Sequence, residues 1–215
     1  MIESLEGSLR RLNTDYIDLY MLHSPLPGYK LDDALVEALD EQKRIGKIRF
    51  WGISLTTNGR GMVPAEQGIQ FINSGKSIDF FELRYNLFER EPEEKLFPLC
   101  REKKIGIIAR VPLASGFLSG KYKEDNRFPS NDVRSRMSQE QINTLVEKAN
   151  KLKFMEEITG KSLAQVALKY CAQNQDVSSV IPGARNTKQV IQNAEVSEME
   201  DFSSEELQKM YDALS

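Results

Sequence analysis

Short apolar runs rich in β-branched and aromatic residues recur along this chain of 215 residues. They cover residues 16–23 (YIDLYMLH), 47–54 (KIRFWGIS), 77–85 (SIDFFELRY), 105–111 (IGIIARV) and 177–183 (VSSVIPG). Runs of this length and composition predict buried strands. The first four begin about 30 residues apart, which is the length of one βαβ unit.

The segments between these runs show the spacing of amphipathic helices. Residues 31–46 carry one apolar stripe that ends at Gly46 and is formed by Leu31, Leu35, Val36, Leu39 and Ile45. Residues 64–76 end likewise around Gly75, and residues 94–104 end in cations that suit a helix C-terminus. Three capping-box pairs predict further helices, namely Ser138/Gln141, Ser162/Gln165 and Ser203/Glu206.

The alternation of strands and helices predicts a parallel sheet covered by helices. An open, doubly wound sheet and a (β/α)8 barrel both have this pattern. A dinucleotide-binding open sheet usually carries G-x-G-x-x-G after its first strand, and this sequence has none. A barrel places its chemistry at the carboxyl ends of strands, where His23, Ser54, Arg110 and Arg185 lie. We therefore predict an α/β fold of the (β/α)8 TIM-barrel family, with about five βα units present, as one partial-barrel domain over residues 1–215.

Composition narrows the classes of function. The chain has 29 Lys plus Arg against 32 Asp plus Glu, so charge gives no case for nucleic acid or an anionic membrane as a partner. No apolar stretch approaches the ~20 residues of a membrane helix, and the N-terminal sequence lacks the apolar core of a signal peptide. Cys100 and Cys171 show no metal or redox spacing, and with one histidine no metal site is expected. These features predict a cytoplasmic protein with reduced thiols.

The turn after the fifth run, residues 180–193 (VIPGARNTKQVIQN), is the first candidate for chemistry. Asn186 can cap a helix that runs through Lys188, Gln189 and Val190, and a capped helix N-terminus binds anions readily. Arg185 suits a phosphate monoester through its bidentate fork. The alternative is an ordinary turn with solvated cations, and this stretch alone leaves both open.

Residues 109–122 (ARVPLASGFLSGKY) also depart from a simple core strand. Arg110 interrupts the apolar run, Pro112 ends the ladder, and Ser115 and Gly116 leave backbone amides approachable. Either a second phosphate or a flat ring binds here, or the segment is a flexible loop with a structural ion pair. The polar segment 123–137 that follows is either an active-site lid or disordered. His23, the only histidine, would face the same mouth, as a proton relay or as a structural residue.

Together these motifs resemble the aldo-keto reductase family. Residues 8–25 (SLRRLNTDYIDLYMLHSP) are similar to its fourth strand, residues 78–91 (IDFFELRYNLFERE) to its sixth, and residues 107–122 (IIARVPLASGFLSGKY) to its seventh. Residues 177–196 (VSSVIPGARNTKQVIQNAEV) resemble the eighth strand with the NADP-binding helix. The resemblance implies a (β/α)8 barrel that binds NADP(H) and passes hydride between the nicotinamide and a carbonyl or alcohol.

By position, the resemblance implies that His23 orients the substrate carbonyl and Ser54 holds the nicotinamide carboxamide. Leu55 replaces an asparagine common after that serine, and Glu82 stands where many members have a glutamine that binds the carboxamide. Arg110 replaces a tyrosine often stacked on the nicotinamide, as in a bacterial subgroup. The implied pyrophosphate contacts are Leu113 and Ser115, and the adenine and 2′-phosphate contacts are Gly183, Arg185, Gln189 and Asn193.

The family's catalytic aspartate, tyrosine and lysine lie in three βα units that precede the fourth strand, and this sequence begins just before that strand. Tyr16, Tyr20 and Tyr85 fall inside other strand motifs, so none matches the proton donor. We therefore expect an N-terminally truncated reductase that is weak or inactive towards a small carbonyl substrate. The alternative is a non-enzymatic NADP-binding or protein-interaction module. Open sheet edges would favour self-association or a partner that supplies strands.

Overall fold

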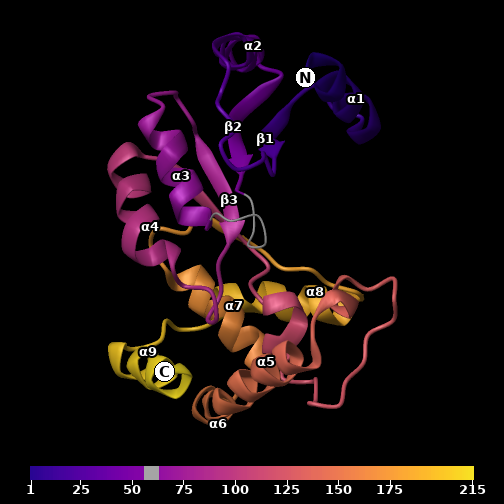
Figure 1. Ribbon diagram of the computed structural model, residues 1–215, viewed down its shortest axis with the longest axis vertical. Helices are drawn as coiled ribbons and strands as arrows, with labels where there is room; N and C mark the ends of the chain where they lie inside the picture. The colour runs from indigo at the N-terminus through magenta and orange to yellow at the C-terminus, as the bar shows by residue number, and fades with distance from the viewer. Residues whose placement is uncertain (56–62) are drawn as a thin grey trace. The chain divides into compact units, whose positions relative to one another are not determined.

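The computed structural model describes residues 1–55 and 63–215 of the chain (Figure 1). The strands are β1 (Ile17–His23), β2 (Ile48–Ser54), β3 (Phe80–Arg84), β4 (Gly106–Arg110) and β5 (Ser179–Ile181). The α-helices are α1 (Ile2–Leu12), α2 (Asp33–Arg44), α3 (Pro64–Asn73), α4 (Pro92–Lys103), α5 (Gln139–Lys151), α6 (Phe154–Thr159), α7 (Leu163–Gln173), α8 (Thr187–Ala194) and α9 (Ser204–Leu214). Short 3-10 helices are η1 (Ala114–Ser119), η2 (Val133–Arg136) and η3 (Glu195–Glu198).

The five strands form one sheet in the order β1-β2-β3-β4-β5. The pairs β1–β2 and β2–β3 are parallel. Backbone bonds from Gly106 N to Asp79 O and from Tyr85 N to Arg110 O join the starts and ends of β3 and β4, so this pair is parallel as well. The prediction of a parallel α/β sheet is confirmed, and the structure shows in addition that the strands are adjacent in chain order.

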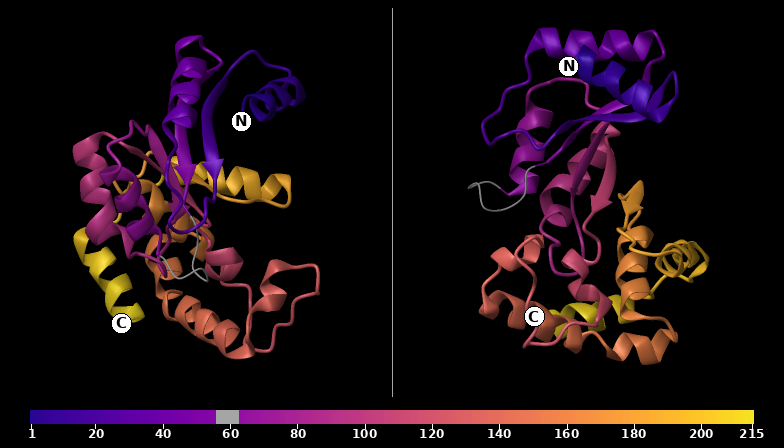
Figure 2. Two further views of the ribbon diagram at one scale, coloured as in Figure 1. Left: turned by 45° about the horizontal axis from the view of Figure 1, so that its top comes forward. Right: turned by 90° about the vertical axis from the view of Figure 1, so that its right-hand side faces the viewer.

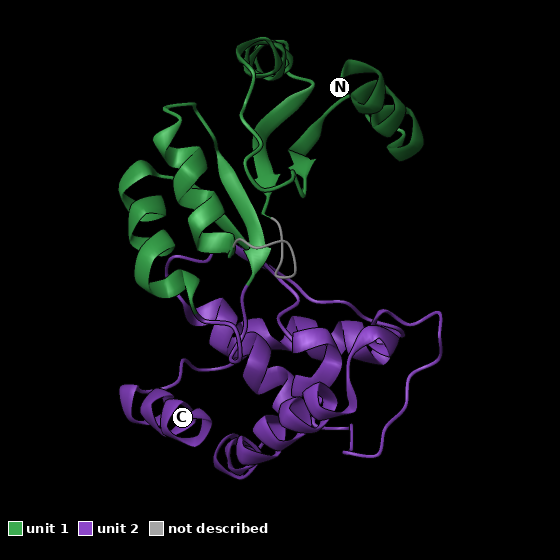
Figure 3. Cartoon of the chain, in the orientation of Figure 1, with its two compact units in different colours: residues 1–84, 91–108 green, residues 85–90, 109–215 purple. Residues whose placement is uncertain are grey.

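The chain divides into two compact units, residues 1–84 with 91–108 and residues 85–90 with 109–215 (Figure 3). We call them unit 1 and unit 2 and describe each by itself. The single partial-barrel domain predicted over residues 1–215 stays a prediction.

Unit 1 is built on β1, β2 and β3. Trp51 is buried, and its indole Nε1 donates to Asp40 Oδ1 at 2.9 Å, which fastens α2 to the sheet. Helices α3 and α4 pack side by side next to β3 (Figures 1 and 2). The register pairs Leu19 with Phe50 on one sheet face, and these side chains are 41% and 44% exposed. One face of this part of the sheet therefore keeps apolar side chains exposed.

Unit 2 has two packed centres. Phe117 of η1 packs with Ile142 and Val146 of α5, and α7 is buried along most of its length. The Tyr85 ring stacks on Tyr170 of α7 with centroids 5.8 Å apart. These contacts tie the carboxyl-end loops of β3 and β4 to the helices of unit 2.

The structure confirms the predicted caps and corrects some boundaries. All three capping boxes, at Ser138, Ser162 and Ser203, are formed. Ile45 was predicted to lie in the buried stripe, but α2 ends at Arg44 and Ile45 is 46% exposed. The fifth strand is shorter than its apolar run, since Pro182 lacks the N–H that a ladder needs. Within the described part of the chain, no helix has both the length and the apolar character to span a bilayer.

Candidate functional site

The residues singled out from the sequence fall into two groups, one in each unit. In unit 1, register places His23 beside Ser54 and Ser54 beside Glu82. His23 and Ser54 end β1 and β2, and Glu82 lies in the middle of β3. The buried Ser54 hydroxyl donates to Glu82 Oε1 at 2.8 Å, and His23 is exposed. Leu55 is fully buried, and its backbone N–H donates to Glu82 O. Unit 1 thus carries an imidazole and a hydroxyl–carboxylate pair on one edge of its sheet.

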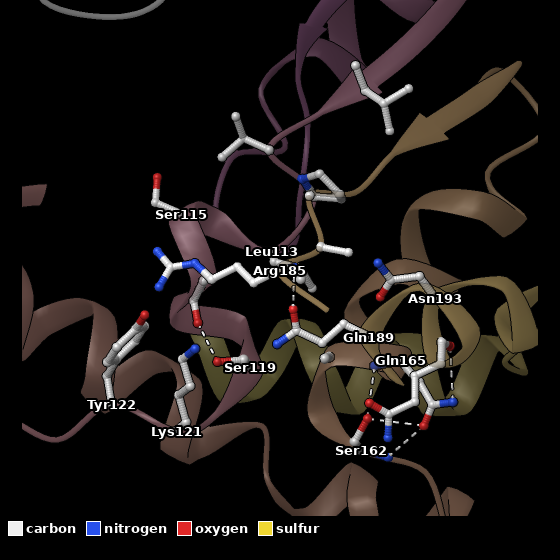
Figure 4. A pocket seen from close by; sticks show the side chains of 18 of the residues that line it. Leu113, Ser115, Ser119, Lys121, Tyr122, Ser162, Gln165, Arg185, Gln189 and Asn193 are labelled. Atoms are coloured by element: carbon white, nitrogen blue, oxygen red, sulfur yellow. Dashed lines mark hydrogen bonds between the residues drawn. The ribbon is translucent and has the colours of Figure 1, made fainter. Parts of the chain in front are cut away.

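In unit 2 a single cavity of about 650 Å³ collects the second group (Figure 4). All of the predicted cofactor contacts that belong to unit 2 line it: Arg110, Leu113, Ser115, Gly183, Arg185, Gln189 and Asn193. They come from the loop after β4 and from the loop and helix after β5. Residues more than 70 positions apart in the sequence therefore share one cavity wall.

The wall after β4 is an unusual left-handed turn. Ala114 and Ser115 have φ angles of 47° and 57°, and Gly116 has 93°. A non-glycine residue in this region costs about 1–2 kcal/mol, so the surrounding contacts must hold the turn in place. Leu113 O supplies two of them, since it accepts from Gly116 N at 2.8 Å and from Leu118 N at 3.1 Å. The turn presents Ser115 to the cavity.

The opposite wall is the N-terminal end of α8, where the predicted cap is confirmed. The Asn186 side chain accepts from Gln189 N at 3.0 Å, and Gln189 Oε1 accepts from Arg185 N at 2.7 Å. This reciprocal pair holds the loop against the helix. The Arg185 side chain is exposed and extends from the loop toward Ser115 (Figure 4). A guanidinium beside a helix N-terminus forms a favourable place for a phosphate.

The charges that line the cavity are of one sign. Its cationic side chains are Arg110, Lys121, Arg134 and Arg185, and no described residue that lines it is acidic. Several cations around a partly enclosed space attract polyanions such as phosphate esters. The arrangement can therefore hold a phosphorylated ligand of extended shape.

Several other lining residues were not assigned to the site from the sequence, among them Lys121, Tyr122, Arg134, Ser162, Gln165 and Gln192. Ser162 and Gln165 had a sequence signal, their capping box, but a helix cap does not reveal which cavity it borders. Arg134 lies in the segment predicted to be a lid or disordered. In the structure this segment contains η2, and Arg134 is only 7% exposed. In a polar segment without hydrophobic periodicity, no sequence pattern indicates which arginine will be buried.

Arg134 perturbs a neighbouring carboxyl group. Side-chain hydrogen bonds from Arg134, and then its backbone N–H, hold the pKa of Asp132 well below its usual range, and nearby Arg185 adds to this. The same pairing raises the pKa of Arg134. Arg134 and Asp132 thus form a fixed ion pair at the edge of the cavity. No group of three or more His, Cys, Asp or Glu within residues 1–55 and 63–215 is placed to hold a metal ion.

The parallel α/β sheet and the sequence motifs together indicate one class of protein, and comparison with known sequences identifies its family. The model of the aldo/keto reductase family matches residues 1–214. This chain belongs to the aldo-keto reductase family, as the motif resemblance predicted.

Two relatives show how much of such proteins the chain represents. A probable voltage-gated potassium channel subunit beta from Oryza sativa subsp. japonica is 32% identical over 204 residues, which are 90% of this chain and 60% of that protein. The uncharacterized oxidoreductase YqkF from Bacillus subtilis (strain 168) is 32% identical over 211 residues, 97% of this chain and 63% of that protein. This chain therefore spans less than two thirds of the length of either relative.

Solved structures show the same fold. The glycerol dehydrogenase AKR11B4 from Gluconobacter oxydans superposes with a TM-score of 0.79 at 24% identity, over 99% of this chain and 62% of that one. An aldo/keto reductase from Klebsiella pneumoniae in complex with NADP and acetate has a TM-score of 0.67 at 26% identity, over 98% of this chain and 63% of that one. The chain thus has the α/β fold of aldo-keto reductases, and a structural relative binds NADP.

Proposed function

We propose that this chain binds NADP(H) through the cavity of unit 2 and is an oxidoreductase of the aldo-keto reductase type. The observation that carries the proposal is that seven residues assigned to cofactor binding from sequence motifs line one cavity whose lining charges are cationic. The relative that contains NADP supports it.

The side chains of the cavity fit the parts of this cofactor. Arg185 and the N-terminal end of α8 suit the 2′-phosphate, because a guanidinium fork matches phosphate oxygens. Ser115 and the turn around it would hold the pyrophosphate, and Arg110 can stack on a flat ring. NADPH, when bound, supplies the hydride. His23 would orient the substrate carbonyl by a hydrogen bond, and Ser54 would hold the carboxamide.

We also propose that turnover by this chain alone is weak. His23 is the catalytic residue that the motifs match, and no tyrosine of this sequence matches the family's proton donor. General acid catalysis contributes about 10²–10⁴-fold. The proposed substrates are small aldehydes, ketones or alcohols.

A second candidate function is a non-enzymatic NADP-binding or protein-interaction module. The observation in its favour is that a relative with 32% identity bears the name of a potassium channel subunit. A partner that supplies strands, or a second copy of this chain, would be bound at the exposed edge strand β1.

The test is calorimetric titration of the chain with NADPH and NADH, beside Arg185→Ala and the control Arg136→Ala. Arg136 is exposed, lies in the same unit and does not line the cavity. A lost charge-assisted bond of about 1.5–3 kcal/mol should weaken NADPH binding by Arg185→Ala about 10–100-fold. The control should bind NADPH like wild type, and NADH should be insensitive to both changes.

Failure of wild type to bind NADPH would overturn the proposal. Where NADPH binds, turnover of an aromatic aldehyde or a quinone separates the two candidate functions. Slow, saturable oxidation of NADPH supports the reductase, and binding without turnover supports the module.

A further inference from the structure

Arg134, the buried arginine of residues 121–137, makes contacts that have no part in the proposed function. Arg134 Nε and Nη2 donate to Asp132 Oδ1 at 2.9 Å and Oδ2 at 2.6 Å, so this pair is bidentate. Arg134 Nη1 donates to Ser115 O at 3.1 Å and to the Tyr122 hydroxyl. One side chain thus connects its own segment with the cavity wall 19 residues earlier.

The rest of the segment is anchored on aromatic side chains. Tyr122, Phe128 and Met137 pack against the core cluster of Phe117, Ile142 and Val146. The guanidinium carbon of Arg134 lies 4.1 Å from the Phe128 ring centroid and 5.0 Å from that of Tyr122. Stacking on aromatic faces and a bidentate carboxylate restrain a guanidinium in orientation as well as in position. The Arg134 side chain is therefore held in one orientation and links residues 121–137 to η1.

The oxygen that accepts from Arg134 at this end, Ser115 O, belongs to the left-handed turn. Ser115 O accepts from Arg134, and Ser115 itself has a φ of 57° beside Ala114 at 47°. Two adjacent non-glycine residues in this region persist only where neighbouring contacts over-determine them. Without the Arg134 bond, the 115–116 peptide would be free to rotate, and the left-handed turn that lines the cavity would lose one of the contacts that fix it.

We infer that Arg134 is a positioning residue for the ligand site: it holds the Ser115 turn in the conformation that receives the pyrophosphate of NADP(H). Its side chain donates to Asp132, Tyr122 and Ser115 O, and of these Ser115 is the residue assigned to the ligand, so the role of Arg134 is exerted through Ser115. The inference rests on the proposed cofactor site and adds a residue to which no motif assigned a role. The Arg134 hydrogen bonds hold the pKa of Asp132 well below its usual range, so the carboxylate stays charged and the ion pair stays formed in mildly acidic solution as well as at neutral pH.

Two ligands of different length test this inference. NADPH would span the cavity from Arg185 to Ser115, whereas adenosine 2′-monophosphate carries only the part assigned to Arg185, Gln189 and Asn193. In Arg134→Lys the charge remains, but an ammonium cannot bridge Asp132 bidentately and also reach Ser115 O. We expect NADPH affinity to fall about tenfold or more and adenosine 2′-monophosphate affinity to stay within about twofold. A residue that only stabilises the fold would not separate the two ligands.

A second variant guards against a failure to fold. Tyr122→Phe removes the hydroxyl that accepts from Arg134 and keeps the ring in the core. The affinity of this variant for both ligands is measured as well, and thermal melting shows whether Tyr122→Phe and Arg134→Lys are folded. It should weaken NADPH about two- to fivefold and leave adenosine 2′-monophosphate unchanged. Equal losses for both ligands in every folded variant, or no loss for either, would overturn the role of Arg134. If wild type binds neither ligand, it is the proposed cofactor site that fails.

Discussion

Replacing Gly52 by alanine tests how closely β2 and β3 are paired in unit 1. Gly52 pairs in register with Phe80, and an added Cβ would lie 2.3 Å from Phe80 O and 2.7 Å from atoms of the Phe80 ring. Both distances are well inside van der Waals contact, and the nearest atom is backbone, which cannot rotate away. The two strands would have to separate, although a backbone bond of 3.0 Å from Asp79 N to Trp51 O joins them.

The expected loss follows from the cost of overpacking. Inserting a methyl group into a packed site costs about 1–3 kcal/mol and occasionally more, and a strained ladder bond adds to this. We therefore expect Gly52→Ala to lower the free energy of unfolding by about 3 kcal/mol. With a urea m-value of about 2 kcal/mol/M, the midpoint should fall by about 1.5 M.

The chain provides its own probe and its own control. Trp51 is the only tryptophan, it is buried in unit 1 and it adjoins Gly52, so its fluorescence in urea reports this unit. Gly7→Ala is the same chemical change inside α1, where the added Cβ would meet only the end of the flexible Arg11 side chain at 3.1 Å. It should raise stability by about 0.5–1 kcal/mol. If Gly52→Ala unfolds at the wild-type midpoint, the close pairing of β2 and β3 is refuted.

Two further predictions concern charge and the exposed sheet edge. Because the folded-state pKa of Asp132 is lowered from an unfolded value of about 3.9, its stabilising contribution is complete above that pH and declines below it. In urea unfolding, the stability advantage of wild type over Asp132→Asn should hold from pH 7 to 5 and shrink by pH 3; an advantage that is constant to pH 3 contradicts this. The second prediction is that the chain self-associates through β1, where Leu19 is 41% exposed. Leu19→Lys should shift sedimentation towards monomer. Leu12→Lys, which changes a 64% exposed leucine of α1, should leave sedimentation unchanged. A wild-type chain that sediments as a monomer would show the prediction wrong.

Local patterns in the sequence were sufficient for most of the elements. Strand and helix positions follow from hydrophobic periodicity, and the caps at Ser138, Ser162, Ser203 and Asn186 use side chains within three residues of their acceptors or donors. Such contacts depend on neighbouring residues, so the sequence alone predicts them. The errors occur where burial decides, as at Ile45, whose apolar side chain fits the stripe but lies beyond the end of α2.

The sequence by itself determined the positions of the strands and most helices, the helix caps and the family motifs that selected the cofactor residues. The tertiary structure alone decided which of those residues meet. It joins Ser54 to Glu82 across two strands, gathers the loops after β4 and β5 around one cavity, and buries Arg134 against Ser115. These contacts link residues 19 or more positions apart. They form because folding buries their surroundings and brings each buried polar group close to a hydrogen-bond partner. The periodicity of the sequence does not indicate which distant residues will become such partners.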